Sequence, residues 1–224
     1  MLQVDNVKIE YYGHELCSLN FTFNKGVTLI LGEVGSFKTT LFLVVGGIKY
    51  IEQGEIKIDG VSIEELPPRH RNMAYVGQNS TPSGVVLKEL LRPLLLRKTA
   101  RKEAKAIALD ACSKFCLSAK QRIKKLSLEQ LIQFFRARLS LRKAQVTMFD
   151  EPYHYFGEQN EQKITDMIKS RSGYVLVSSC DGADVNRLNP DYLVVVRRDK
   201  VLYDGKTADV VNCTDEYVKK ILNE

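Results

Sequence analysis

Apolar and polar positions alternate in two parts of the N-terminal segment, around residues 4–9 and 19–23. A period of two is typical of strands with one buried face, so we expect two strands of a small antiparallel sheet. An apolar run follows at 27–31, and a second apolar segment at 38–45 ends at the pair Gly46-Gly47. This order predicts a buried strand, a loop and a helix closed by glycine.

The middle of the chain changes from strand patterns to helical ones. Residues 54–59 predict a strand that ends at a turn, and residues 73–76 predict another. Residues 85–116 are rich in Leu, Lys and Ala at helical spacing, with Pro82 and Pro93 as expected breaks. We therefore expect a helical subdomain here, inserted at about residues 79–126.

Strands and helices alternate in the C-terminal half. The pattern predicts a helix at 127–142, a strand at 146–149, a helix at 158–169, a strand at 174–179, a hairpin of 192–197 with 201–203, and a helix at 215–222. Strands separated by helices favour a parallel sheet with both faces covered. The chain is thus expected to form one α/β domain over residues 1–224, with an N-terminal antiparallel β-subdomain and the helical insert.

Composition agrees with a folded core, since 44% of the 224 residues are hydrophobic and 27% are charged. The net charge of +6 suits an anionic partner, such as a nucleotide, a nucleic acid or a membrane surface, or simply a mildly basic surface. The five cysteines show no CxxC spacing, which argues against a zinc site and a disulfide framework. No run of eighteen apolar residues and no signal-peptide plan is present, so we expect neither a membrane span nor export.

The segment between the apolar strand at 27–31 and the helix at 38–45 matches a phosphate-binding Walker A loop. Its candidate nucleotide-binding residues are Gly32, Glu33, Val34, Gly35, Ser36, Phe37, Lys38, Thr39 and Thr40. Backbone N–H groups of such a loop surround phosphate, Lys38 can reach the β- and γ-phosphates, and Thr39 can ligate Mg²⁺. The usual pattern has glycine before the lysine, so Phe37 is expected to crowd the phosphates and to resist a positive φ.

Two adjacent carboxylates follow the apolar run at 146–149, which is typical of a Walker B motif. Ligand sites of α/β sheets lie at the carboxyl ends of the strands, where Asp150 and Glu151 would stand. Asp150 would hold Mg²⁺ through water, and Glu151 would polarise the water that attacks the γ-phosphate. A solvated acidic turn is the alternative interpretation.

The order of these motifs resembles the ABC ATPases across nearly the whole chain, which implies a P-loop NTPase core of that type. Tyr12 matches the aromatic that stacks on adenine in that family, with Tyr11 as the next candidate, unless either is an exposed strand residue. Gln78 matches the glutamine that contacts Mg²⁺ and the attacking water. Ser127 lies in Leu-Ser-Leu-Glu-Gln, at the place of the Leu-Ser-Gly-Gly-Gln signature that contacts the ATP of an opposing subunit.

Several positions depart from the family pattern. Leu128 and Glu129 replace the signature glycines and put bulk and negative charge beside that γ-phosphate, so the contact should weaken. Cys180 stands where the family has a switch histidine, and a thiol cannot supply a cationic hydrogen bond. His154 is either a substitute or an ordinary surface or packing histidine. Nucleotide binding is therefore expected to be kept, and hydrolysis to be impaired.

The resemblance implies an ATP-binding subunit of an ABC membrane transporter, with Glu151, Gln78 and Lys38 as catalytic residues. ATP and Mg²⁺ would be its cofactors, with Thr39, Gln78 and Asp150 around the metal. A membrane-spanning subunit would hold it on the cytoplasmic face, and a second ABC ATPase subunit, either a like or an unlike one, would complete a dimer. A nucleotide-gated regulatory module with little or no ATPase activity is the main alternative. A soluble ABC ATPase acting on nucleic acid or ribosomes has only the basic charge to support it.

Overall fold

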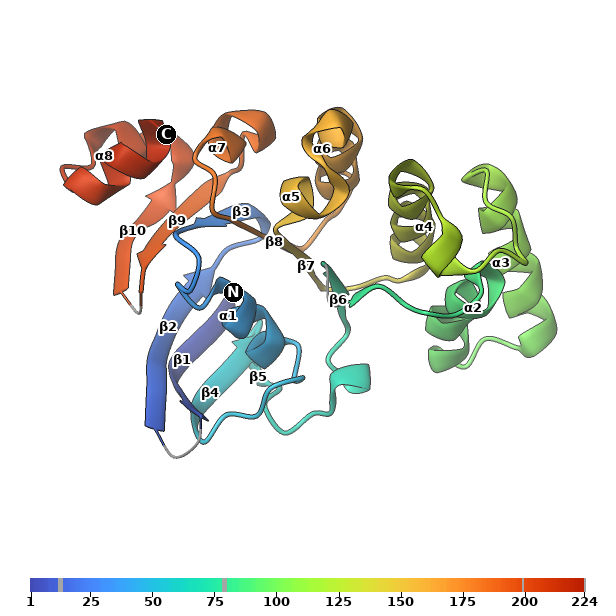
Figure 1. Ribbon diagram of the computed structural model, residues 1–224. Coiled ribbons are helices and arrows are strands. Elements are labelled where there is room, and N and C mark those ends of the chain that lie inside the picture. Colours follow the sequence, from blue (N-terminus) through green and yellow to red (C-terminus); the bar gives the residue numbers. More distant parts are fainter. Residues whose placement is uncertain (12–13, 78–79, 199, 224) are drawn as a thin grey trace.

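The computed structural model describes residues 1–11, 14–77, 80–198 and 200–223. Its strands are β1 (Leu2–Tyr11), β2 (His14–Phe23), β3 (Gly26–Leu31), β4 (Gln53–Ile58), β5 (Val61–Ser62), β6 (Met73–Val76), β7 (Val146–Asp150), β8 (Tyr174–Ser179), β9 (Tyr192–Arg197) and β10 (Lys200–Lys206). Its helices are α1 (Lys38–Val45), α2 (Val86–Leu96), α3 (Arg101–Lys114), α4 (Leu128–Leu141), α5 (Pro152–Phe156), α6 (Glu161–Lys169), α7 (Ala183–Leu188) and α8 (Glu216–Asn223). Figure 1 shows their arrangement.

The larger sheet has the strand order β10-β9-β3-β8-β7-β6. Its pairs are parallel except for the hairpin of β9 with β10, which confirms the parallel sheet expected from the alternation of strands and helices. Every residue of β7 and β8 is buried, because helices and the smaller sheet cover both faces. The carboxyl ends of β3, β8, β7 and β6 therefore meet along one edge of the sheet.

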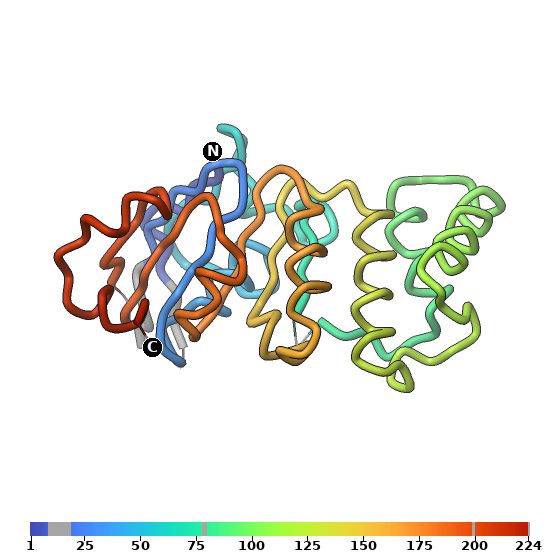
Figure 2. The backbone as a smooth tube through the Cα atoms, turned by 90° about the horizontal axis from the view of Figure 1, so that it is seen from above, coloured from blue at the N-terminus to red at the C-terminus, as the bar shows by residue number. Residues whose placement is uncertain are grey.

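The smaller sheet is antiparallel, with the order β2-β1-β4-β5, and confirms the two N-terminal strands. One hydrophobic cluster joins this sheet, α1 and one face of the larger sheet, through residues such as Val4, Phe42 and Leu176. A second cluster joins the opposite face to the other helices (Figures 1 and 2). Helix α1 is thus fixed between two sheets, and the loop before it is anchored at both ends.

Pro93 does not break the helical region as the sequence suggested, because it lies inside α2. Proline removes the helical hydrogen bond to the Glu89 carbonyl four residues earlier. The neighbouring Leu90 and Leu94 are buried in the cluster that packs α2 with α3 and α4, and this burial compensates for the missing bond. Helix α5 was also missed, although Pro152 at its first position is typical of a helix start.

Asp59 links the turn after β4 to the amino end of β8. The Tyr174 hydroxyl donates a 2.6 Å hydrogen bond to the Asp59 carboxylate, and the Met1 ammonium lies 2.9 Å from the same oxygen. These contacts hold the pKa of Asp59 well below its ordinary 3.8. A depressed folded pKa stabilises the fold above the ordinary pKa, and this contribution is lost as the pH falls through the folded value.

Tyr174→Phe is therefore expected to lower the urea midpoint of unfolding at pH 6, because it removes the donor that most favours the ionised Asp59. The difference from wild type should shrink once the pH falls below the ordinary 3.8, because Asp59 then takes up a proton in the unfolded chain while the folded wild type keeps it ionised. Tyr50→Phe is the matched control, since Tyr50 is 92% exposed. An equal loss at both pH values would assign the effect to packing rather than to charge.

Candidate functional site

The loop between β3 and α1 is held against β9 and folds back on itself. A Cβ at Gly32 would lie 2.3 Å from the Val196 carbonyl oxygen, so only glycine permits this approach. Gly35 has φ +88°, which also favours glycine. The Ser36 hydroxyl donates a 2.7 Å hydrogen bond to the Glu33 carbonyl. The local geometry of the loop therefore explains why glycine occupies both positions of the Walker A pattern, Gly32 and Gly35.

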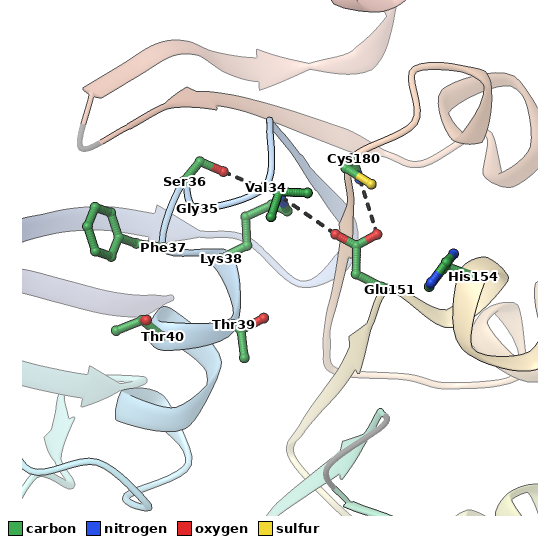
Figure 3. A pocket seen from close by; sticks show the side chains of 10 residues that line it. All are labelled: Val34, Gly35, Ser36, Phe37, Lys38, Thr39, Thr40, Glu151, His154 and Cys180. Carbon is green, nitrogen blue, oxygen red and sulfur yellow. Dashed lines mark hydrogen bonds and ion pairs between the residues drawn. The ribbon is translucent and has the colours of Figure 1, made fainter.

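Phe37 adopts φ 62°, in the left-handed region where the family pattern has glycine. The expected resistance to a positive φ does not prevent this conformation, although it costs energy. The ring packs against the hydrophobic cluster shared by α1 and the smaller sheet, which offsets part of the cost. It points away from Glu151 and Cys180 (Figure 3). The bulk of Phe37 thus lies mainly on the outer side of the loop.

The Lys38 ammonium is buried at the centre of the loop. It donates hydrogen bonds to the carbonyl oxygens of Gly32, at 2.5 Å, and Glu33, at 3.0 Å. It also lies 3.6 Å from a carboxylate oxygen of Glu151 (Figure 3). A buried cation in contact with neutral carbonyl groups is prepared to exchange them for a charged phosphate, because charge-assisted hydrogen bonds are stronger.

Thr39 and Asp150, two of the expected magnesium ligands, are in direct contact although they are far apart in sequence. The Thr39 hydroxyl donates a 3.1 Å hydrogen bond to Asp150, which is only 8% exposed. Ser178 and Tyr75 also donate to this carboxylate, at 2.6 and 2.7 Å. Burial, together with the carboxylate it contacts, raises the pKa of Tyr75, so Tyr75 stays a proton donor.

Sequence reasoning missed Tyr75 and Ser178. Both lie near the carboxyl ends of strands adjacent to β7, where Ser178 is the register partner of Asp150. Strand order brings these side chains together, and periodicity does not encode strand order. A polar residue near the end of an apolar strand was the available signal.

The donor set around Asp150 fits Mg²⁺ only with help from a ligand. Among the described residues no group of three or more His, Cys, Asp or Glu side chains could hold a metal ion. Mg²⁺ ordinarily keeps several waters and is held by one or two carboxylates together with substrate phosphates. Thr39 and Asp150 suit that mode, with a triphosphate supplying the remaining oxygens.

Glu151 adopts a left-handed conformation, φ 46°, between β7 and α5. Its backbone N–H donates a 3.0 Å hydrogen bond to the Ser178 hydroxyl, and its carboxylate accepts a 3.2 Å bond from the Cys180 N–H. Strained backbone of this kind clusters at functional sites and persists where neighbours hold it. The carboxylate is thereby directed toward Lys38 (Figure 3).

Cys180 and His154 lie on either side of Glu151 at the edge of the same pocket (Figure 3). Burial and the nearby Glu151 charge raise the pKa of the Cys180 thiol, so it stays neutral. His154 is exposed on α5 and lines the pocket, an outcome that the sequence left open between substitute and surface residue. An imidazole is therefore present at this edge, although it does not come from the switch position.

The pocket has a volume of about 480 Å³. It is lined by Val34, Gly35, Ser36, Phe37, Lys38, Thr39, Thr40, Glu151, His154 and Cys180. The structure thus gathers most of the Walker A candidates and Glu151 around one space, with Asp150 attached through Thr39. The remaining candidates Tyr12 and Gln78 lie outside the described residues.

Ser127 does not line this pocket. It caps the amino end of α4, where its hydroxyl accepts a 3.2 Å hydrogen bond from the Gln130 N–H and the Gln130 side chain accepts one from Ser127. Leu128 is 45% exposed, and Glu129 forms an ion pair with Lys163 of α6. This ion pair partly neutralises the negative charge expected to face an opposing nucleotide.

The fold and the phosphate-loop geometry define a class of protein, and comparison with known proteins agrees with it. A family model described as ABC transporter matches residues 16–154. The chain therefore belongs to the ABC transporter family, as an ATP-binding domain. In the described ranges no helix is long and apolar enough to cross a membrane.

Individual relatives share part or all of the chain. This chain is 30% identical over 180 residues to the molybdate/tungstate import ATP-binding protein WtpC of Pyrococcus horikoshii. The matched segment covers 75% of this chain and 50% of that protein. The chain is 34% identical over 139 residues to the spermidine/putrescine import ATP-binding protein PotA of Legionella pneumophila, covering 60% and 38%. The chain thus spans about half the length of these relatives or less. The glutamine transport ATP-binding protein GlnQ of Geobacillus stearothermophilus is 26% identical over 96% of each chain.

Solved structures share the fold across nearly the whole chain. A nucleotide-free ATP-binding cassette from an ABC transporter has a TM-score of 0.78 at 17% identity and covers 99% of this chain and 98% of its own. A second ATP-binding cassette of an ABC transporter has a TM-score of 0.79 at 19% identity, with the same coverage. These structures confirm the predicted α/β core of ABC type.

Proposed function

We propose that this chain is the ATP-binding subunit of an ABC membrane transporter, which binds Mg-ATP and hydrolyses it slowly to drive transport. The observation that carries the proposal is the convergence of Lys38, the Thr39–Asp150 pair and Glu151 on one pocket. We also propose that residues 1–224 form a single ABC ATPase domain with a helical insert at about 79–126. Equilibrium binding of labelled ATP with and without Mg²⁺, followed by a turnover measurement, tests the proposal.

The side chains that converge on the pocket have separate proposed roles. The loop N–H groups and Lys38 bind the phosphates, since Lys38 can leave the Gly32 and Glu33 carbonyls for stronger charged partners. Thr39 and Asp150 would hold Mg²⁺, which would supply positive charge against the transferring phosphoryl group. Glu151 polarises the attacking water, and the Cys180 N–H together with Lys38 orients its carboxylate. Tyr12 and Gln78 keep their proposed adenine and magnesium contacts.

The relatives support a transporter partner and an import direction. WtpC and PotA are named as import proteins for molybdate or tungstate and for spermidine or putrescine. Their substrates differ in charge and size, so the names favour import without indicating one substrate. We propose that a membrane-spanning subunit holds this chain on the cytoplasmic face. We further propose a dimer with an unlike ABC ATPase subunit whose signature glycines are intact.

Replacing Leu128 and Glu129 by glycine is expected to promote ATP-dependent dimerisation. In the proposed dimer these residues, next to Ser127, would lie beside the γ-phosphate bound by the opposing subunit, and glycine removes their bulk and charge. The effect should be clearest with Glu151→Gln added to block hydrolysis. The two glycines cost roughly 1 kcal/mol each in the first turn of α4, which the Ser127 cap helps to tolerate. Sedimentation with and without Mg-ATP is the measurement.

Lys163→Ala is the control for this pair of substitutions, because it removes the partner of Glu129 and leaves Leu128 and Glu129 in place. The Lys163→Ala protein should stay mostly monomeric with ATP, as expected for wild type. A tight wild-type homodimer with rapid hydrolysis would contradict the need for an unlike partner.

Cys180→His is expected to raise ATP turnover by about tenfold or more, since an imidazole at the switch position supplies the missing hydrogen bond to the γ-phosphate. Cys180→Ala is the matched control, because it removes the thiol without adding a donor, and its turnover should stay within about twofold of wild type. His154→Ala in both backgrounds shows whether that imidazole already serves the site. Equal turnover of the histidine and alanine variants would exclude the switch position as the cause of slow hydrolysis.

A nucleotide-gated regulatory module with little or no ATPase activity is the second candidate. The neutral Cys180 thiol beside Glu151 and the exposed Leu128 at the signature favour it, because both leave binding groups intact and remove groups used in hydrolysis. Tight ATP binding with no turnover, alone and beside a partner subunit, would establish this candidate over the ATPase.

A further inference from the structure

Most of the positive charge of the chain lies in the helical region. Residues 86–125 contain twelve lysines or arginines and three acidic residues, which gives a net charge of +9 against +6 for the whole chain. All twelve basic residues are exposed. The charge is concentrated on α2, α3 and the loops that follow, at the end of the molecule away from β10 (Figures 1 and 2). The other residues together are net negative.

The turn between α2 and α3 carries a compact cluster that we call the basic tip. It consists of Leu95, Leu96, Arg97, Lys98, Arg101 and Lys102, all of them exposed. In the ranges that the structure describes, none of its four cations forms an ion pair. Lys98 adopts φ 59°, which turns the chain between the two helices and places the cations of both in one region.

The two leucines differ from their neighbours in α2. Leu90 and Leu94 are buried in the hydrophobic cluster, whereas Leu95 and Leu96 are 43% and 59% exposed. Exposed apolar pairs surrounded by cations are typical of segments that lie in a lipid interface, where apolar side chains enter the acyl boundary and cations meet phosphates. The long stems of Arg97 and Lys98 allow their charges to stay in the headgroup layer.

We propose that the basic tip binds the surface of an anionic lipid bilayer, with Leu95 and Leu96 inserted into the interface and the surrounding cations on lipid phosphates. A negative surface potential attracts such clusters, and each added cation contributes to binding. Helix α4 lies between the basic tip and the helices α1 and α5, which carry lining residues of the nucleotide pocket (Figure 1). The interaction is therefore independent of that pocket. It supplies a second contact with the membrane besides the transporter subunit.

The positive charge would also suit a nucleic acid, but the composition of residues 86–125 disfavours that partner. Single-stranded nucleic acid binding relies on aromatic side chains on which bases stack. Phe115 is the only aromatic residue in 86–125, and it lies at the opposite end of α3 from the basic tip. Burial in lipid removes exposed leucine side chains from water and is favourable in free energy, whereas a phosphate backbone offers them no apolar surface.

The test is cosedimentation with phosphatidylcholine vesicles that contain or lack phosphatidylglycerol. Wild-type protein should bind the anionic vesicles in a salt-sensitive way and the neutral ones weakly. Changing Arg97, Lys98 and Arg101 to glutamate should lower this affinity at least roughly tenfold. Changing Lys200, Lys206 and Lys219 to glutamate, with the same change in net charge at the other end of the molecule, should lower it by less than about threefold.

A second variant separates lipid from nucleic acid. Leu95→Ser with Leu96→Ser keeps every charge, so it should weaken vesicle binding by about fivefold or more and leave any binding of a labelled single-stranded RNA unchanged. Absence of vesicle binding, equal losses in the two glutamate variants, or RNA that displaces the protein from vesicles would overturn the proposal. ATP affinity is expected to be the same in all variants, so failure here is distinguishable from failure of the proposed function.

Discussion

Lys38→Ala is expected to lower the affinity for Mg-ATP by roughly 100-fold or more, because it deletes the one loop side chain that pairs with the β- and γ-phosphates. The ammonium is already buried beside the Gly32 and Glu33 carbonyls, so little reorganisation is needed before it meets phosphate. Equilibrium binding of a labelled ATP is the measurement. Thermal unfolding of the variant without nucleotide shows whether the loop itself survives the substitution.

Lys169→Ala is the matched control for charge, since Lys169 is an exposed cation at the end of α6. Its ATP affinity should equal that of wild type. If Lys38→Ala bound ATP as tightly as this control, the loop at 32–40 would not be the phosphate site, and the proposed function would lose its main support.

Glu151→Gln is expected to leave ATP affinity near wild type and to lower hydrolysis by roughly 100-fold or more, the scale expected for a general base. The amide can keep accepting from the Cys180 N–H, so the loop after β7 should keep its conformation. Single-turnover hydrolysis with excess enzyme is the measurement, because it isolates the chemical step from product release.

Asp150→Asn should give the opposite pattern, with weaker binding that depends on Mg²⁺. The side-chain amide retains one acceptor for Thr39 or Ser178 but loses the charge that the metal requires. Binding measured with and without Mg²⁺ separates the two variants. Matching behaviour of Glu151→Gln and Asp150→Asn would show that the two carboxylates do not divide the roles as proposed.

Sequence periodicity predicted most elements of the core because their local signals were strong. The apolar segments at 38–45 and 174–179 correspond to α1 and β8 at the predicted residues, and each has glycine at one boundary, Gly46 after α1 and Gly173 before β8. Local signals failed where packing decided the outcome. Pro93 stays inside α2 because its neighbours are buried, and α5 is too short for a period to show.

The candidate site was partly predictable for the same reason. A glycine loop between strand and helix, and two carboxylates after an apolar strand, are local patterns, and they named Lys38, Thr39, Asp150 and Glu151. Their functional roles remain predictions that the substitutions above test. The hydroxyls of Tyr75 and Ser178 were missed because a polar residue near the end of an apolar strand is a weak signal by itself. The strand order that brings them to Asp150 is not encoded locally.

The sequence by itself predicted which residues form the phosphate loop, where the paired carboxylates stand, and, through the resemblance to the family, that other residues replace the signature glycines and the switch histidine. These predictions depend on residue identity and spacing alone. Only the tertiary structure decided that Asp150 accepts hydrogen bonds from Thr39, Ser178 and Tyr75. It also decided that the Phe37 ring points away from Glu151 and that Leu95 and Leu96 stay exposed among cations. Contacts of this kind depend on strand order and on which helix faces pack together, and these are set by burial of the whole chain rather than by any short segment.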